Sequence, residues 1–368
     1  MARKPEKVEA PPPWPLPRTN TRLVGHADAE AALLESFNSG KLPHAWLISG
    51  PRGIGKATLA HRFARFLLAG EHGGGLFGGA PTSLDVDPSV PAARRLIAGG
   101  HADMRAVEIG YNENTGRRRT EIVIGDVRDL GSFMRLTPAE GGWRVAVIDA
   151  ADEMNRAATN AVLKLLEEPP PRSVLMLVAH ASGSLLPTVR SRCRRLTLKA
   201  LSEETVVSLL GDYMPDLPAD ERVGLARLAD GSIGRALEFA EAGGLKLYGD
   251  LFALLDGLPR LDASALHAFA ERVGRRGEEG ERDFRTVAFL LDWWLKTLVR
   301  QGAVGEAPVG LMAGEAPLRQ RLLQGAGLDR WMQVWEKVAH LFARADAVNL
   351  DRKQVVLGSL FAFQSAIR

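Results

Sequence analysis

The chain has 368 residues, of which 46% are hydrophobic and 25% charged, as in an ordinary soluble globular protein of two or three domains. Its formal net charge of +3, from 47 Lys and Arg against 44 Asp and Glu, is too small to indicate nucleic acid binding by itself. The single cysteine, Cys193, excludes an internal disulfide and a four-cysteine metal site.

The first 21 residues are expected to form a proline-rich arm that includes Pro11-Pro12-Pro13-Trp14-Pro15. Basic residues near the start are not followed by an apolar core, so we expect no secretory signal. The most apolar later stretch, Val287–Val299, is interrupted by Asp292 and Lys296 and falls short of the about 18 residues that a membrane span needs. We therefore expect a cytoplasmic protein without membrane contact.

Strand-like and helix-like segments alternate over residues 22–200. Apolar runs of strand length occupy 44–49, 106–109, 144–148 and 174–178. Helical periodicity is found in 57–68 and in segments that begin near Val127 and Asn155. This alternation predicts an α/β domain whose parallel sheet is covered on both faces by helices. The glycine-rich stretch 70–91 and the polar stretch 111–120 are expected to be loops.

The pattern becomes helical at Leu201. Ser202-Glu203-Glu204 is typical of a helix start, and apolar residues then recur at helical spacing to Ala242. Gly243-Gly244 predicts a border between a small helical domain, 201–244, and a larger one, 245–368. The expected fold class is thus α/β plus all-α.

A glycine-rich loop joins the first predicted strand to the helix after it. Its sequence is Gly50-Pro51-Arg52-Gly53-Ile54-Gly55-Lys56-Ala57-Thr58. Glycines let backbone N–H groups turn inward around phosphate oxygens, and the lysine adds a positive charge beside the helix N-terminus. The pattern predicts a nucleotide-binding loop, with a strand-to-helix turn kept for packing as the alternative.

The position after Lys56 in such loops normally offers a hydroxyl to Mg²⁺, and here it is Ala57. Thr58 comes one residue later, about 100° further round a helix, and is expected to point elsewhere. The sequence leaves ATP binding open and predicts that Mg²⁺ is held weakly or not at all.

Asp149 ends the apolar run Val145–Ile148, where an acidic residue can hold the hydration shell of Mg²⁺. A glutamate that polarises the attacking water usually follows, but here Ala150 does. Asp152 and Glu153 are expected to be capping or surface charges at the start of the next helix. Two parts of the catalytic set are therefore missing, and no efficient ATPase is expected.

The basic segment Ser191-Arg192-Cys193-Arg194-Arg195 closes the α/β domain. It is either a solvated turn or the site of an arginine finger that reaches a neighbouring subunit's nucleotide. Such a finger contributes roughly 10³ to 10⁵ in rate. The residues themselves leave both interpretations open.

These motifs occur in a recognisable order. The series is Arg22-Leu23-Val24-Gly25-His26, Leu42-Pro43-His44-Ala45-Trp46, the glycine loop, Leu136 to Gly142, Ile148 to Asn155, Asn160 to Pro170 and Ser191-Arg192-Cys193. It resembles the bacterial clamp-loader branch of the AAA+ ATPases, densely over about 22–198 and more thinly beyond. The resemblance implies a P-loop AAA+ domain, a helical lid and a C-terminal helical collar.

What the resemblance implies for function is a stationary subunit of a hetero-pentamer of DNA polymerase III. Its partners would be a delta subunit and motor subunits of the gamma/tau type, and the motor subunits would use ATP to place a sliding clamp on primed DNA. The role of finger then falls on Arg192, and the location would be the replisome.

Three departures from the family pattern bear on this expectation. The four cysteines that hold zinc in many relatives are absent. Gly55 and Lys56 are retained, although some relatives have lost them. The place of a sensor arginine is taken by Gly234, and Arg235 beside it is not expected to touch phosphate.

Two other functions stay open. One is an active AAA+ motor subunit or related replication and repair ATPase, which would use Thr58 and a displaced acid such as Asp152. The other is a small-nucleotide kinase, which the long helical C-terminal half and the lack of an arginine-rich lid disfavour.

Overall fold

The computed structural model describes residues 12–70, 79–111, 119–305, 310–348 and 350–367. The chain forms two compact units. The described residues of Met1–Asp216 and Gly231–Gly234 make up the first, and those of Leu217–Asp230 and Arg235–Arg368 the second. The predicted domain borders at residues 200 and 244 stay a prediction.

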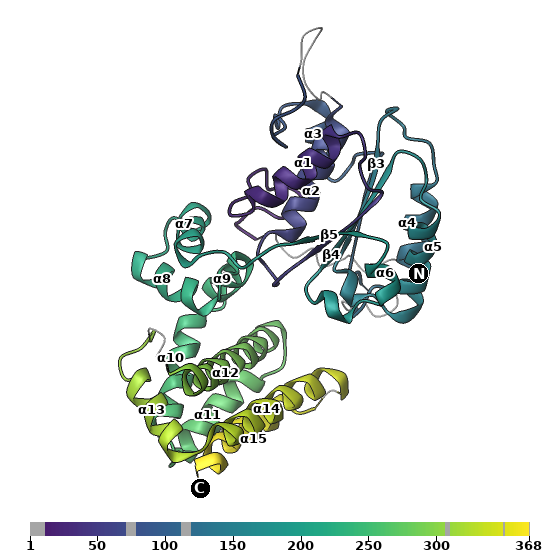
Figure 1. Ribbon diagram of the computed structural model, residues 1–368. Helices are drawn as coiled ribbons and strands as arrows, with labels where there is room; N and C mark the ends of the chain where they lie inside the picture. Colours follow the sequence, from purple (N-terminus) through teal and green to yellow (C-terminus); the bar gives the residue numbers. More distant parts are fainter. Residues whose placement is uncertain (1–11, 71–78, 112–118, 306–309, 349, 368) are drawn as a thin grey trace, which may run out of the picture. The chain divides into compact units, whose positions relative to one another are not determined.

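The first unit is built on a five-stranded sheet in the order β2-β3-β4-β1-β5. Its strands are β1 Ala45–Ser49, β2 Met104–Glu108, β3 Arg144–Asp149, β4 Ser173–Ala179 and β5 Arg194–Thr197. Every neighbouring pair is parallel (Figure 1). The predicted parallel sheet is confirmed, and the carboxyl ends of all strands consequently meet at one edge.

Alternating residues of each central strand face two separate cores. Trp46 and Ile48 of β1 belong to the core with Leu59 and Phe63, whereas Leu47 belongs to the core on the other face. The first core is closed by α1 Ala27–Asn38, α2 Lys56–Ala69 and α3 Pro91–Ile97. The second is closed by α4 Ile124–Met134, α5 Arg156–Glu167 and α6 Pro187–Arg190. The sheet is thus covered on both faces, as predicted.

The remaining elements of this unit are two short helices between strands and one helix that comes after the last strand in the sequence. They are the one-turn 3₁₀ helices η1 Ala151–Glu153 and η2 Ser182–Ser184, and α7 Glu203–Tyr213. The Ser202 side chain accepts a hydrogen bond from the backbone N–H of Thr205 and so caps α7, where a helix start was predicted. Asn155 caps α5 in the same way through the N–H of Ala158.

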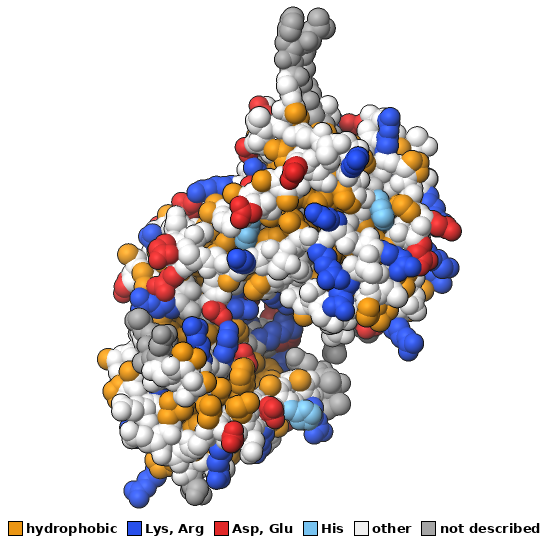
Figure 2. Space-filling view, in the orientation of Figure 1, with side chains coloured by type: hydrophobic (Ala, Val, Ile, Leu, Met, Phe, Trp, Pro, Cys, Tyr) orange, Lys and Arg blue, Asp and Glu red, His pale blue; other side chains and the backbone are white. Residues whose placement is uncertain are grey.

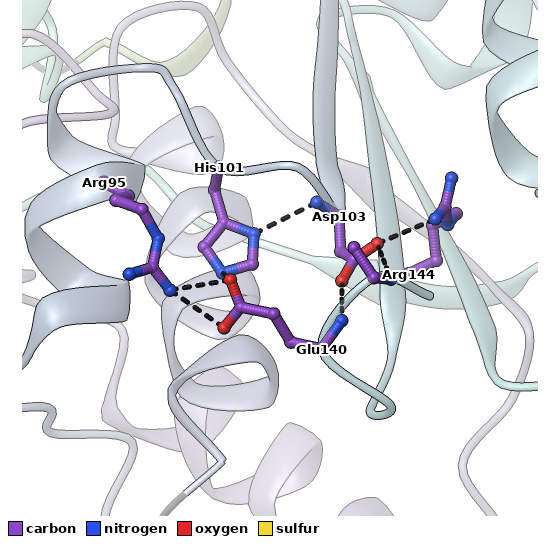
Figure 3. Close-up of polar contacts among 6 residues, drawn as sticks. Arg95, His101, Asp103, Glu140 and Arg144 are labelled. Atoms are coloured by element: carbon purple, nitrogen blue, oxygen red, sulfur yellow. Dashed lines mark hydrogen bonds and ion pairs between the residues drawn. The ribbon is translucent and has the colours of Figure 1, made fainter. Parts of the chain in front are cut away.

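A buried ion pair fixes the start of β3 (Figure 3). Arg144 Nη2 lies 2.8 Å from Asp103 Oδ1, and the two side chains are 4% and 1% exposed. The Asp103 carboxylate also accepts hydrogen bonds from the backbone N–H groups of Ala139 and Glu140. Because both charges are paired and hydrogen-bonded, the loop before β3 is tied to the strand beside it.

The described part of the second unit consists of helices joined by loops. Its helices are α8 Ala219–Leu228, α9 Ile233–Glu241, α10 Gly244–Asp256, α11 Ala263–Gly274, α12 Glu278–Val304, α13 Glu315–Gly325, α14 Leu328–Val348 and α15 Arg352–Ile367. The first two residues of α9 belong to the α/β unit. Buried apolar residues lie on several faces of α15, among them Val355, Leu357 and Phe363, because α11 and α14 both pack against it.

The surface is of mixed charge. Figure 2 shows Lys and Arg side chains scattered among acidic ones over the visible face, in keeping with a net charge of only +3. None of the helices in the described ranges combines the length and apolar character that spanning a bilayer requires.

Candidate functional site

The glycine loop leaves the carboxyl end of β1 and enters α2. Gly50, Gly53 and Gly55 have φ of 144°, 74° and 106°, a region that L-residues with side chains rarely adopt. A Cβ on Gly50 would also lie 2.4 Å from the carbonyl oxygen of Leu198. The glycines are therefore required by the shape of the loop, which is the strand–loop–helix arrangement that binds phosphate.

Lys56, the first residue of α2, points back into this loop. Its Nζ donates to the carbonyl oxygen of Gly50 at 2.7 Å and to that of Pro51, and the residue is only 2% exposed. Burial lowers the pKa of Lys56 to about 8, against the opposing effect of the Asp149 and Asp152 carboxylates. A buried ammonium held by carbonyl oxygens at a helix N-terminus fits an anionic phosphate group.

Two segments hold the loop from outside. His26 Nε2 lies 2.7 Å from the carbonyl oxygen of Ile54. The N–H of Gly234 donates to the carbonyl oxygen of Gly53 at 2.8 Å. A Cβ on Gly234 would lie 2.9 Å from Gly53 Cα, so this contact requires a residue without a side chain. The place expected for a sensor arginine is thus taken by a backbone contact.

Asp149 lies at the carboxyl end of β3, and Glu108 is its partner in the register of β2. Burial and the Glu108 carboxylate raise the pKa of Asp149 to about 6, and the charge of Lys56 opposes this shift. In the described part of the chain Lys56 forms no ion pair with Asp149. The edge of the sheet beside the loop therefore carries two neighbouring carboxylates, neither of which has a salt-bridge partner among the described residues.

The residues around Asp149 do not supply the missing catalytic groups. Ala150 is buried, and Asp152 lies in the one-turn helix η1, the first helical element after β3, where a helix start was expected. The Asp152 carboxylate accepts hydrogen bonds from the backbone N–H groups of His180, at 3.0 and 3.1 Å, and Ala181, at 2.8 Å. It is occupied in holding the segment after β4, which disfavours a role as displaced catalytic acid.

The glycine loop is less suited to hold a metal ion than to hold a phosphate group. Ala57 has no ligand atom in its side chain, and Thr58 beside it is buried on α2. The described residues contain no group of three or more His, Cys, Asp or Glu side chains placed to hold a metal ion. The site accordingly fits an anion but lacks the hydroxyl through which P-loops hold Mg²⁺.

His180 also belongs to this site, although the sequence analysis did not single it out. It follows β4 directly, and its Nδ1 is buried without a hydrogen-bond partner among the described residues. Burial, together with the charge of nearby Lys56, lowers the pKa of His180 to about 4. In the sequence, the only sign of its role is that it follows an apolar strand of 7 residues. That this strand lies beside β1, and so beside the glycine loop, depends on the sheet order, which the local sequence does not contain.

Arg192 lies away from these groups, between α6 and β5. Its Nη2 lies 3.0 Å from Glu167 Oε1 on α5, and its Nη1 donates to the carbonyl oxygen of Thr188 at 3.1 Å. Its side chain is 38% exposed. Burial raises the pKa of neighbouring Cys193 to about 11, so this thiol stays protonated at neutral pH. The guanidinium is thus accessible at the surface and has no contact with the chain's own loop.

Comparison with known proteins identifies the α/β part of the chain. Residues 25–202 match a family model described as DNA polymerase III, delta subunit. Over these residues, just under half of the chain, the α/β part is similar to DNA polymerase III subunits of the clamp-loader branch. The match includes the glycine loop, Asp149 and Arg192.

Individual relatives come from both kinds of clamp-loader subunit. A DNA polymerase III subunit delta' of Pseudomonas aeruginosa is 34% identical over 51% of this chain and 53% of its own length. A subunit tau of Salmonella typhimurium is 28% identical over 83% of this chain and 47% of its own length. The chain thus spans about half the length of these relatives. A solved gamma-subunit-related protein of Thermotoga maritima is similar at 20% identity and a TM-score of 0.38, covering 91% of this chain and 100% of its own.

Proposed function

We propose that this chain is a delta-prime-like, non-hydrolysing subunit of the DNA polymerase III clamp loader. In this proposal its loop holds a nucleotide without turning it over efficiently, and Arg192 completes the ATP site of a neighbouring motor subunit. The assembly would contain gamma/tau-type motor subunits and a delta subunit, and would load a sliding clamp on primed DNA. The setting would be the replisome in the cytoplasm.

One observation carries the non-hydrolysing role. The position after Asp149 is a buried alanine, and the next acid along the chain, Asp152, accepts hydrogen bonds from two backbone N–H groups. A general base must reach the attacking water, and a carboxylate already bound to the segment after β4 is poorly placed for this. The absence of a hydroxyl at Ala57 points the same way.

The finger role is supported by what surrounds Arg192. Its ion pair with Glu167 joins side chains that are 38% and 50% exposed, and such pairs are worth only about 0–1 kcal/mol. The guanidinium can therefore exchange this partner for a phosphate of another subunit at little cost. A guanidinium is also the group best suited to bidentate phosphate contact.

The decisive experiment assembles the chain with its motor subunits and measures DNA-stimulated ATP turnover. Arg192→Ala should lower turnover while the assembly stays intact by gel filtration, because a finger contributes roughly 10³ to 10⁵ at the site it serves. Arg195→Ala, a nearby exposed arginine on β5, is the matched control and should leave turnover unchanged. Unchanged turnover with Arg192→Ala in an intact complex would refute the finger role.

A motor subunit is the second candidate, because tau and gamma/tau relatives match a larger share of this chain than the delta' relative does. The isolated chain separates the two. Steady ATP turnover that Lys56→Ala abolishes would establish a motor, whereas the proposed function predicts none above background.

A further inference from the structure

We propose that the glycine loop takes a nucleoside diphosphate without a divalent metal ion, in preference to a triphosphate. The proposal rests on the proposed nucleotide binding at this loop and names its ligand class. It is independent of the role of Arg192.

The groups that hold the inner phosphates are complete. The positive-φ glycines shape the loop, Lys56 is buried inside it, and α2 presents its N-terminus at the same place. His26 and Gly234 fix two of its carbonyl oxygens from outside. Because the cradle is already formed, binding costs little ordering of the chain.

Two positions at which related loops hold an outer phosphate or its metal ion, Ala57 and Gly234, lack the side-chain groups that would do so. Ala57 offers no hydroxyl to Mg²⁺. Gly234 offers no cation, and its approach to Gly53 leaves no room for a Cβ. A third phosphate would therefore gain neither a metal bridge nor a side-chain contact at these two positions.

The nearby edge of the sheet also opposes a third phosphate. Glu108 and Asp149 stand side by side in the β2–β3 register, and neighbouring strands are about 4.8 Å apart. Arg52, the exposed cation of the loop, is 3.9 Å from Glu153 and so is partly neutralised. The pKa of Asp149, about 6, leaves it charged at pH 7.5. Added phosphate charge is thus repelled, and Ala57 offers no hydroxyl to hold a metal ion that would compensate it here.

A metal ion held by Glu108 and Asp149 is the strongest rival explanation. Two adjacent carboxylates can take Mg²⁺, but Mg²⁺ prefers six ligands in near-octahedral geometry, and the described residues offer no third His, Cys, Asp or Glu side chain for such a site. Nucleotide binding measured with and without Mg²⁺ decides between these possibilities.

The test is equilibrium binding of mant-labelled ADP and ATP to the full chain, followed by fluorescence anisotropy at pH 7.5, with Mg²⁺ or with EDTA. ADP should bind about tenfold more tightly than ATP, from the repulsion of one additional charge. Replacing Mg²⁺ by EDTA should change either affinity less than about twofold. Lys56→Ala should abolish binding of both nucleotides.

A gain-of-function variant sharpens the test. Ala57→Thr restores the hydroxyl at a half-buried position and should make ATP binding dependent on Mg²⁺, tightening it about fivefold or more in the presence of the metal. Ala69→Thr, at the other end of the same helix and also half-buried, is the matched control and should change nothing. Thermal unfolding of both variants checks that the fold is retained.

The outcomes separate this inference from the proposed function. Binding of Mg·ATP that equals or exceeds that of ADP in the wild-type chain overturns the inference and leaves nucleotide binding in place. Absence of binding for either nucleotide at millimolar concentration overturns both the inference and the nucleotide part of the proposed function. The finger role is decided separately by Arg192→Ala in the assembly.

Discussion

The guanidinium of Arg192 on the turn after α6 lies 3.0 Å from the carboxylate of Glu167 at the end of α5. If Arg192 serves a neighbouring subunit, Glu167 competes with that subunit's phosphate for the same group. In the proposed function, Glu167 would then hold Arg192 in reserve within its own chain.

Glu167→Gln should therefore raise DNA-stimulated ATP turnover of the assembly or lower its KM for ATP. The expected effect is at most about fivefold, because an exposed ion pair is worth about 0–1 kcal/mol. Glu168→Gln, an exposed neighbour, is the control. A fall in turnover with Glu167→Gln would mean that the ion pair positions Arg192 for its task instead of restraining it.

Asp149→Asn should stabilise the chain at neutral pH. The folded-state pKa of Asp149 is about 6, above the usual 3.8, so its protonated form is favoured by folding. Stability linked to this group is present below about pH 3.8 and is lost as pH rises through 6. The variant should gain about 1–2 kcal/mol at pH 7.5 and little at pH 4.5.

Urea unfolding at the two pH values measures this difference. Asp129→Asn on the exposed face of α4 is the control and should show no such pH-dependent gain. Equal stability of Asp149→Asn and the wild-type chain at pH 7.5 would show that Asp149 is better solvated or better paired than its surroundings indicate. If the variant is more stable than the wild-type chain only at high pH, the charged Asp149 carboxylate destabilises the folded chain.

The central part of the α/β fold could be predicted because local sequence signals agree there with the tertiary structure. The apolar run of β1 is buried on both faces and ends in a glycine whose φ is positive. Asn155 and Ser202 precede helices that their side chains cap. At these positions the residue type that suits the local backbone also suits the fold.

Other features depend on contacts that a local pattern does not contain. The basic segment at Arg194 was expected to lie in a turn or finger segment, yet Arg194–Thr197 forms β5, an edge strand whose side chains are largely exposed. An edge strand needs no apolar alternation, since it pairs with β1 on one side only in the described sheet. The hydrogen bond from the His180 N–H to the Asp152 carboxylate likewise joins residues that are 28 positions apart in the sequence.

Loss of one partner of the Asp103–Arg144 pair should destabilise the α/β unit strongly. Asp103→Asn leaves Arg144 buried without a full counter-charge, and breaking such a pair costs about 3–5 kcal/mol. Arg95→Met removes the exposed partner of Glu140 in the same region and should cost no more than about 1 kcal/mol. Urea unfolding at pH 7 compares the two variants. Similar losses would show that burial of the Asp103–Arg144 pair is not what ties β3 to the preceding loop.

Gly234→Ala tests the contact that supports the glycine loop from outside. The added methyl group would lie 2.9 Å from Gly53 Cα and 3.3 Å from the Gly53 carbonyl oxygen, both backbone atoms, so the two segments must separate. We expect the free energy of unfolding to fall by about 1–2 kcal/mol through strain and loss of the hydrogen bond. Nucleotide affinity should fall as well, because Gly53 is displaced from the cradle.

The matched control for this change is Gly125→Ala on α4, where an added Cβ has no heavy atom within 4 Å. It should leave stability and nucleotide affinity unchanged or slightly improve stability, since alanine favours helix over glycine. If Gly234→Ala lowers stability without changing affinity for mant-ADP, the Gly234 contact stabilises the fold alone. If both fall together, the backbone contact also positions the phosphate loop, in the place where a motor subunit would use a side chain.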